Sequence, residues 1–204
     1  TKKAFENAIR VASAIGASSN CPPHLIAIAK HMGIKIEIDD WQRLGHEMPL
    51  LVNCQPAGEH LMEGFFKAGG IPAVMQELIK NNKIHKDVLT VTGKTIAENL
   101  NKDINIDKNV IRSFSNPLVK NAGFIIMRSN FFSSAVMKTS VISNEFRDRY
   151  LSNPKNPNCF ETTAVVFEGP EDYHKRINNE NLIIDENSIL IIRGCGPVGY
   201  PGSA

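Results

Sequence analysis

The stretch that decides the fold is PLLVNCQPAGEHLMEGFFKAGGIPAVMQELIKNN, residues 49–82. It opens with PLLVN at 49–53, a short and almost wholly apolar run that is typical of a buried strand. Two segments with helical spacing of apolar residues follow at 58–70 and 71–82, separated by a glycine pair and a proline. A short strand followed by helices predicts an α/β layer architecture.

The preceding segment supports the same fold class. Residues 1–15 carry a helical stripe of apolar side chains, so the sequence opens inside a helix that should end near Gly16. A second helix is predicted in SSNCPPHLIAIAKHMG at 18–33, with Ser19 or Asn20 as its N-cap and glycine at its end. The next helix, in DDWQRLGHE at 39–47, is expected to begin with Asp39 or Asp40 as cap. The apolar residues of these helices and of the segment that follows are expected in the core: Leu25, Ile28, Ala29, Met32, Trp41, Phe65 and Phe66.

From Phe124 onward the pattern changes from helical to strand-like. The predicted strands lie in GFIIMRS (123–129), SAVMKTSVI (134–142), TAVVFEG (163–169) and SILIIRG (188–194). One helix is predicted in PEDYHKRIN at 170–178. The connector SFSNPLVKN at 113–121 marks a domain boundary, which we place between residues 117 and 118.

Composition excludes several classes of protein. The chain has 204 residues, 42% of them hydrophobic and 22% charged, which is typical of a globular protein and not of a disordered one. Its formal net charge of +2, without any block of like charges, argues against a nucleic-acid partner. No apolar run approaches the roughly 18 residues of a membrane span, and TKKAFENAIR at the start does not resemble a signal peptide. A cytoplasmic protein is therefore expected, and a small anionic substrate is compatible with the charge.

The four cysteines are expected to be separate thiols. Cys21, Cys54, Cys159 and Cys195 are far apart in the sequence and form no C-x-x-C pair, which argues against a zinc ribbon or a disulfide framework. Free cysteine packs as a small apolar residue, so all four are predicted to be buried.

Two short motifs suggest phosphate binding, and both are incomplete. GCGPVG at 194–199 matches G-x-G-x-x-G after a strand, but Pro197 within it and Pro201 after it remove amide donors and break the helix that a dinucleotide site needs. A rigid loop is the better interpretation. TGKT at 92–95 resembles the end of a P-loop, but Val88 stands where the pattern requires its first glycine. An anion at a helix N-terminus and a simple cap by Thr92 or Thr95 remain equal alternatives.

A polar turn joins the first two predicted helices. Ser18, Ser19 and Asn20 place hydroxyl and amide groups at the start of the second helix. They could bind a polyol or a carboxylate, or they could serve only as a helix cap.

Taken in order, the sequence resembles the dihydroxy-acid dehydratase and 6-phosphogluconate dehydratase family over essentially its whole length. The matching blocks are IGASSNCPPHLIAIAKHMGI, MPLLVNCQPAGEHLMEGFFKAGGIPAVMQELI, LTVTGKTIAENL, VIRSFSNPL, GFIIMRSN, AVMKTSVIS and IIRGCGPVGYPGSA. Within the family, GYPGSA at 199–204 and EDYHKRIN at 171–178 favour the sugar-acid (aldonate) branch, such as xylonate or arabinonate dehydratases. The branched-chain amino acid enzyme usually has G-G-P-G-M in that loop.

The resemblance implies a fold and an activity. Residues 1–117 would form the end of a large flavodoxin-like α/β domain, and residues 118–204 the start of a β-rich, barrel-like C-terminal domain. The function implied is that of a hydro-lyase converting an aldonate to a 2-keto-3-deoxy sugar acid with an iron–sulfur cluster, of the 2Fe–2S type, and Mg²⁺. The chain would be a segment of a longer enzyme, a homodimer or homotetramer, and inactive alone.

The resemblance also implies which residues serve the site. Ser18, Ser19 and Asn20 would lie near the substrate cavity, whereas the catalytic residues and metal ligands would lie outside residues 1–204. The terminal loop would support an acidic magnesium ligand that follows it; its residues are Gly194, Gly196, Gly199, Gly202 and Ser203. The alternatives are a dihydroxy-acid dehydratase of branched-chain amino acid biosynthesis, a non-catalytic binding module, or a nucleotide-binding enzyme that uses one of the two glycine motifs.

Overall fold

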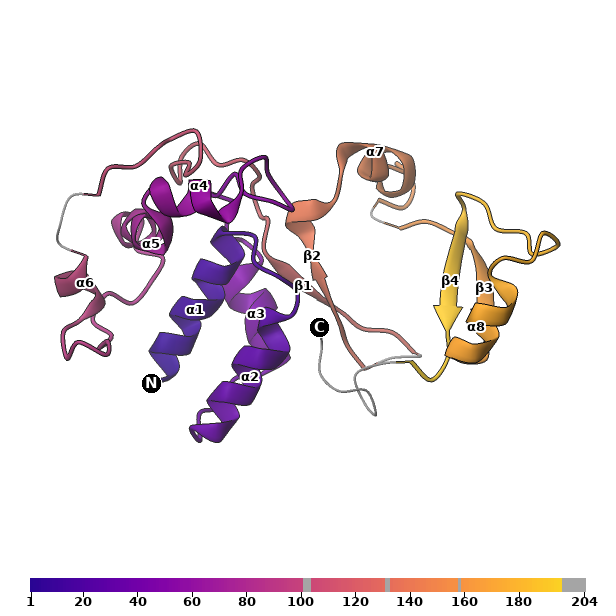
Figure 1. Cartoon of the computed structure of the whole chain (residues 1–204), viewed down its shortest axis with the longest axis horizontal. Coiled ribbons are helices and arrows are strands. Elements are labelled where there is room, and N and C mark those ends of the chain that lie inside the picture. The colour runs from indigo at the N-terminus through magenta and orange to yellow at the C-terminus, as the bar shows by residue number, and fades with distance from the viewer. Residues whose placement is uncertain (101–103, 131–132, 158, 196–204) are drawn as a thin grey trace. The chain divides into compact units, whose positions relative to one another are not determined.

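The computed structural model describes residues 1–100, 104–130, 133–157 and 159–195 (Figure 1). Two compact units are present, Thr1–Ile142 and Ser143–Ala204, and each is described by itself. In the described part of the chain, no helix combines the length and the apolar character needed to cross a membrane.

Three helices open the first unit. Helix α1 (Lys2–Ala14) is capped by Thr1, whose hydroxyl accepts a hydrogen bond from the Ala4 amide. Helices α2 (Cys21–His31) and α3 (Ile38–Gly45) follow, and α1 packs against both. The predicted helices at 1–15 and 18–33 are thus confirmed, and Gly16 and Gly33 end them in the left-handed region at φ of 64° and 67°. A glycine is favoured there because a Cβ would clash with its own backbone.

The stretch at 49–82 forms the centre of the first unit. Residues 50–54 are buried and extended, with isolated bridges from Leu50 to Val119 and from Val52 to Ile111. In the described part of the chain, the predicted strand is therefore a buried extended segment that joins no sheet. Helices α4 (Met62–Lys67) and α5 (Gly70–Lys80) follow as the pattern predicts. The short helix α6 (Ile96–Asn99) comes next.

An antiparallel hairpin completes the first unit. Strand β1 (Phe124–Met127) pairs with β2 (Ala135–Lys138), and a 3₁₀ turn, η1 (Thr139–Val141), follows. Helix α3 packs against β1. At this contact the rings of Trp41 and Phe124, both fully buried, meet edge to face with centroids 5.0 Å apart.

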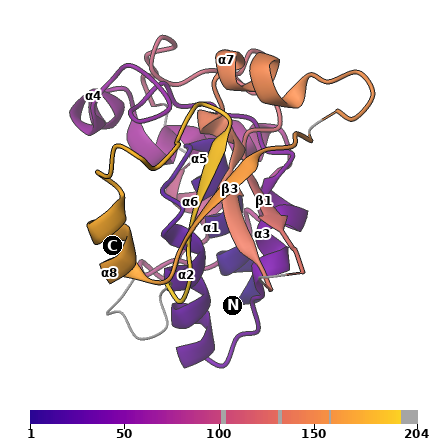
Figure 2. The same cartoon turned by 90° about the vertical axis from the view of Figure 1, so that its right-hand side faces the viewer.

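The second unit contains a β-α-β arrangement (Figure 2). Strands β3 (Thr163–Phe167) and β4 (Ser188–Ile192) are parallel, and helix α8 (Pro170–Arg176) connects them. The centroid of the fully buried Phe167 ring lies 5.3 Å from the centroid of the Tyr173 ring. A short helix, α7 (Asn144–Phe146), runs into a π-helical turn, η2 (Arg147–Leu151), before β3. All four predicted strands and the helix at 170–178 are present, but the strand predicted at 134–142 ends at Lys138, where the 3₁₀ turn begins.

The fold class is confirmed in its coarse form, a mixture of helices and strands. The sheets are two separate two-stranded pairs, and within the described ranges neither closes into a barrel. The boundary between residues 117 and 118 stays a prediction. The compact first unit continues to Ile142 because the hairpin packs on α3.

Several predictions about single residues are wrong. Ile28, Met32 and Phe66 are exposed by 53%, 62% and 80%, because no described element covers those faces of α2 and α4. The N-cap of α3 is Glu37, and Asp40 occupies the third helical position of a capping box. Asp39 and Asp40 therefore lie inside the helix that they were expected to cap.

The cysteines are free thiols, as predicted, but only one is buried. Cys54 is buried and Cys21 is half-buried, whereas Cys159 and Cys195 are exposed. The exposed pair lies in the second unit, where fewer apolar residues are available to cover them.

Candidate functional site

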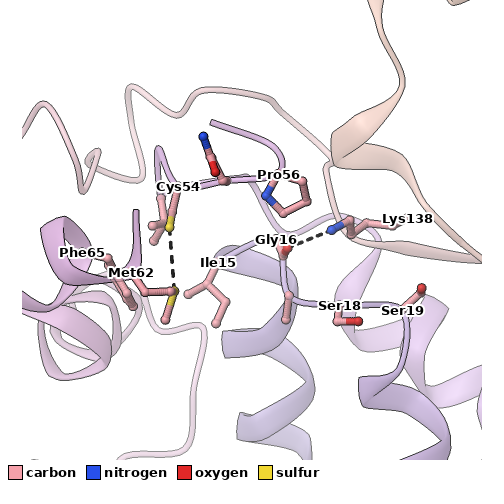
Figure 3. A pocket seen from close by; sticks show the side chains of 12 residues that line it. Ile15, Gly16, Ser18, Ser19, Cys54, Pro56, Met62, Phe65 and Lys138 are labelled. Carbon is pink, nitrogen blue, oxygen red and sulfur yellow. Dashed lines mark hydrogen bonds between the residues drawn. The ribbon is translucent and has the colours of Figure 1, made fainter. Parts of the chain in front are cut away.

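The first unit contains a pocket of about 560 Å³ beside the loop that follows α1 (Figure 3). Its walls come from that loop, from the buried extended segment and the residues directly after it, from α4 and from the end of β2. The lining residues are Ile15, Gly16, Ala17, Ser18, Ser19, Val52, Cys54, Gln55, Pro56, Met62, Phe65 and Lys138.

Ser18 and Ser19 form the polar part of the wall. Both are exposed, and the Ser18 hydroxyl accepts a hydrogen bond of 3.2 Å from the Asn20 amide. The Ser18 hydroxyl proton is therefore available to a ligand. Asn20 is the N-cap residue of α2, but its side chain makes no capping hydrogen bond and it does not line the pocket. The structure thus brings two of the three predicted residues, Ser18 and Ser19, to one cavity.

The wall on the other side is apolar and contains sulfur. Cys54 and Phe65 are buried, and the Cys54 Sγ lies 3.7 Å from the Sδ of Met62, which is itself 66% exposed (Figure 3). Thioether and aromatic groups adapt to the shape of a ligand without requiring hydrogen bonds. The pocket therefore has one polar and one apolar side, as small-molecule sites commonly do.

Lys138 brings a positive charge to this pocket from the end of β2. Its ammonium donates a hydrogen bond of 3.0 Å to the carbonyl oxygen of Gly16 (Figure 3). Partial burial lowers the pKa of Lys138 below its ordinary value, and Cys21 opposes this shift in part. Burial also raises the pKa of the Cys21 thiol, an effect that Lys138 reduces. Lys138 was not singled out from the sequence, because a cation at the end of the apolar run AVMK at 135–138 does not show which loop it contacts.

The predicted terminal loop is described only at its start. Gly194 follows β4 in a turn with a φ of 67°, a left-handed conformation that suits glycine. Gly196, Gly199, Gly202 and Ser203 lie outside the described residues. The role predicted for this loop therefore stays a prediction.

The TGKT motif at 92–95 is part of a helix cap. Thr95 is the N-cap residue of α6, with its hydroxyl accepting from the Glu98 amide and the Glu98 carboxylate accepting from the Thr95 amide. The Thr92 hydroxyl binds the side chain of Asn99 instead, and Lys94 is exposed. Of the two alternatives for this motif, the geometry favours the cap.

Metal-ligating side chains do not gather in the described part of the chain. Across residues 1–100, 104–130, 133–157 and 159–195, no three His, Cys, Asp or Glu residues come together in a way that could hold a metal ion. These residues therefore do not fit an iron–sulfur cluster or a magnesium centre. The chemistry that they offer is hydrogen bonding by hydroxyls and charge pairing by Lys138.

The described part of the chain is a mixed α and β protein whose first unit carries a pocket with the mixed polar and apolar lining found in small-molecule sites. The chain belongs to the dihydroxy-acid/6-phosphogluconate dehydratase family: the N-terminal family model matches residues 1–99 and the C-terminal model residues 109–204. Residues 15–65 of the pocket wall fall in the first match and Lys138 in the second.

Three relatives match all or nearly all of this chain. Over all of this chain, a D-xylonate dehydratase of Caulobacter vibrioides is 53% identical and an L-arabinonate dehydratase of Rhizobium leguminosarum is 42% identical. A dihydroxy-acid dehydratase of Lactococcus lactis is 37% identical over 99% of the chain. The chain spans about a third of these relatives' length, 34% in each case.

Proposed function

We propose that the protein containing this chain is a hydro-lyase that dehydrates a sugar acid (aldonate) to a 2-keto-3-deoxy sugar acid. The observation that carries the proposal is the identity of 53% to a D-xylonate dehydratase over the whole chain, against 37% to a dihydroxy-acid dehydratase. The pocket supports it, because hydroxyls and a cation beside an apolar wall suit a polyhydroxy acid.

The reaction removes water without any change of redox state. A proton leaves C2 of the aldonate, the C3 hydroxyl leaves with its bonding electrons, and the resulting enol tautomerises to the 2-keto acid. An iron–sulfur cluster, of the 2Fe–2S type, and Mg²⁺ would supply Lewis acids, and we assign their ligands to residues outside 1–204. No catalytic step is assigned to a residue of this chain.

The described residues bind and orient the substrate. The hydroxyls of Ser18 and Ser19 exchange hydrogen bonds with substrate hydroxyls, which fixes one face of the carbon chain. Cys54, Met62 and Phe65 cover the opposite face and reduce the access of water. Orientation of this kind lowers the entropic part of the barrier even though these groups transfer no proton.

The rest of the architecture extends the family resemblance. We propose that residues 1–117 end a large flavodoxin-like domain and that residues 118–204 start a barrel-like one, with the loop from Gly194 to Ser203 supporting a magnesium ligand. We further propose a cytoplasmic homodimer or homotetramer. Size-exclusion chromatography with light scattering on the complete protein would measure the oligomeric state.

The test is a comparison of substrates on the complete, cofactor-loaded protein. D-xylonate, L-arabinonate and D-gluconate are offered beside 2,3-dihydroxyisovalerate, and the 2-keto acid product is trapped with semicarbazide and quantified. We expect at least one aldonate to be turned over with a kcat/KM well above that of 2,3-dihydroxyisovalerate. Turnover of 2,3-dihydroxyisovalerate alone, or of no substrate, would contradict the proposal. Residues 1–204 alone should give no product.

Two serine variants test the assigned pocket. Ser18→Ala and Ser19→Ala should raise KM for the aldonate, because each removes a hydrogen bond whose net contribution is about 0.5–1.5 kcal/mol. Ser134→Ala, at an exposed position that does not line the pocket, is the matched control. Equal KM values in all three variants would show that the substrate does not bind at Ser18 and Ser19.

A further inference from the structure

Lys138 is a half-buried cation without a counter-ion in the part of the chain that the structure describes. Among the described residues, no carboxylate forms an ion pair with its ammonium, and the Cys21 thiol, whose pKa is raised by burial, provides no negative charge at neutral pH. Holding a charge partly out of water is unfavourable unless an opposite charge compensates. Lys138 lies at the wall of a cavity, and no group in the described structure neutralises its charge. This arrangement is expected of a site that binds an anion.

The remaining hydrogen-bonding capacity of Lys138 is available to a ligand. An ammonium has three N–H donors, and the carbonyl oxygen of Gly16 takes one at 3.0 Å. That bond fixes the head group at the pocket wall, beside the loop that carries Ser18 and Ser19. The two other donors can serve an acceptor in the cavity.

A second polar atom next to Gly16 also lacks a partner. The hydroxyl oxygen of Ser140 is buried and makes no hydrogen bond in the described structure. It lies 3.6 Å from the position that a Cβ on Gly16 would occupy. Unsatisfied polar groups thus lie close to the contact between Gly16 and Lys138.

We infer that Lys138 is a positioning residue that pairs with the carboxylate of the substrate, so that this pocket selects an acid over the corresponding neutral polyol. The inference rests on the proposed function. The Lys138 ammonium binds a carboxylate oxygen while Ser18 and Ser19 bind hydroxyls further along the chain. Charge and hydroxyl recognition would then come from two segments that are far apart in the sequence.

The competing explanation is that Lys138 has a structural role only, in which its hydrogen bond holds β2 against the loop at Gly16. That role requires a hydrogen-bond donor, whereas pairing with a carboxylate requires a positive charge. Lys138→Gln keeps a donor and removes the charge, and Lys138→Arg keeps both. Lys30→Gln, at an exposed position on α2 that does not line the pocket, is the matched control.

The experiment measures binding in the complete protein by calorimetry. The probes are a five-carbon 3-deoxy aldonate, which lacks the leaving hydroxyl, and the corresponding neutral 3-deoxy alditol. Lys138→Gln should raise Kd for the acid about 10- to 100-fold, the usual effect of losing a charged hydrogen bond, and leave Kd for the alditol unchanged. Lys138→Arg and Lys30→Gln should bind the acid nearly as the unmodified protein does.

The outcomes separate this inference from the proposed function. Equal weakening of acid and alditol by Lys138→Gln, or no change in either, overturns the inference even where aldonates are turned over. Failure of the unmodified protein both to bind the acid and to dehydrate aldonates overturns the proposed function as well. If Lys138→Gln does not fold, the salt dependence of the unmodified protein decides. Affinity for the acid should fall with added salt while that for the alditol stays constant, and an equal response of the two contradicts the pairing.

Discussion

The ammonium of Lys138 and the carbonyl oxygen of Gly16 are joined by a hydrogen bond of 3.0 Å across 122 residues of sequence. This contact links the end of β2 to the loop between α1 and α2. The same loop presents Ser18 and Ser19 to the pocket. The shape of the pocket therefore depends on the backbone conformation at Gly16.

Gly16→Ala should destabilise the protein more than the same change at Gly33. Both glycines have a left-handed φ, which costs a residue with a Cβ about 1–2 kcal/mol. A Cβ on Gly16 would also lie 2.9 Å from Leu50 Cδ1, whereas one on Gly33 meets no atom within 4 Å. Urea unfolding of the two variants measures the difference. Equal midpoints would show that the contact with Leu50 relaxes without cost.

The pH dependence of Lys138 should appear with opposite signs in binding and in stability. Burial lowers its pKa below the ordinary 10.5, so the folded state releases this proton at a lower pH than the unfolded state. Aldonate affinity should therefore decline at an alkaline pH below 10.5. Between the folded and unfolded pKa values the unfolded state binds more protons, so the contribution of Lys138 to the free energy of unfolding rises with pH. Lys138→Gln should abolish both effects, as titrations of affinity and urea midpoint from pH 7 to 11 would reveal.

Phe124→Ala should destabilise the first unit by about 3–5 kcal/mol, because it leaves a cavity against a fully buried ring. Trp41 is the single tryptophan of the chain, so its fluorescence reports this contact directly. The emission should shift to longer wavelength as water reaches the indole. Phe66→Ala, at a ring that is 80% exposed, is the control and should stay within about 0.5 kcal/mol. Comparable losses in the two variants would contradict the assigned core.

Asp40→Asn should reduce the loss of unfolding free energy that occurs as the pH falls below about 4. Burial alone would raise the pKa of Asp40, but hydrogen bonds from the Glu37 amide at 3.0 Å and from Arg43 at 2.5 Å lower it overall. The stability that this carboxylate contributes is present above its unfolded pKa, near 3.9, and is lost as pH falls through the lower folded value. Asp107→Asn, at an exposed residue, serves as the comparison. Identical acid midpoints for Asp40→Asn and the unmodified protein would contradict the prediction.

Periodicity predicted most elements of this fold and failed where burial depends on a neighbouring element. The helical spacing of α2 places Ile28, Ala29 and Met32 on related faces, yet only Ala29 is buried. Spacing states which side chains share a face, but not whether a second element covers it. The N-cap of α3 was missed because aspartate is a preferred cap residue and glutamate is not, whereas the extended backbone at Glu37 places the start of the helix one residue before the aspartates.

The substrate-binding role of Ser18 and Ser19 stays a prediction from the family resemblance, and the structure shows that both residues line one pocket. Lys138 could not be assigned, since its importance comes from a contact with a loop 122 residues earlier. A single sequence contains no direct record of such a pairing.

The distance along the chain between Gly16 and Lys138 has a consequence for biosynthesis. When the ribosome has synthesised the chain through Phe65, the serine hydroxyls, the sulfur atoms and the aromatic ring of the pocket are present, but its positive charge is not. Until residue 138 emerges, the pocket residues already made lack the ammonium that we assign to the substrate carboxylate, so this contribution to acid recognition is added after the hydroxyls and the apolar wall.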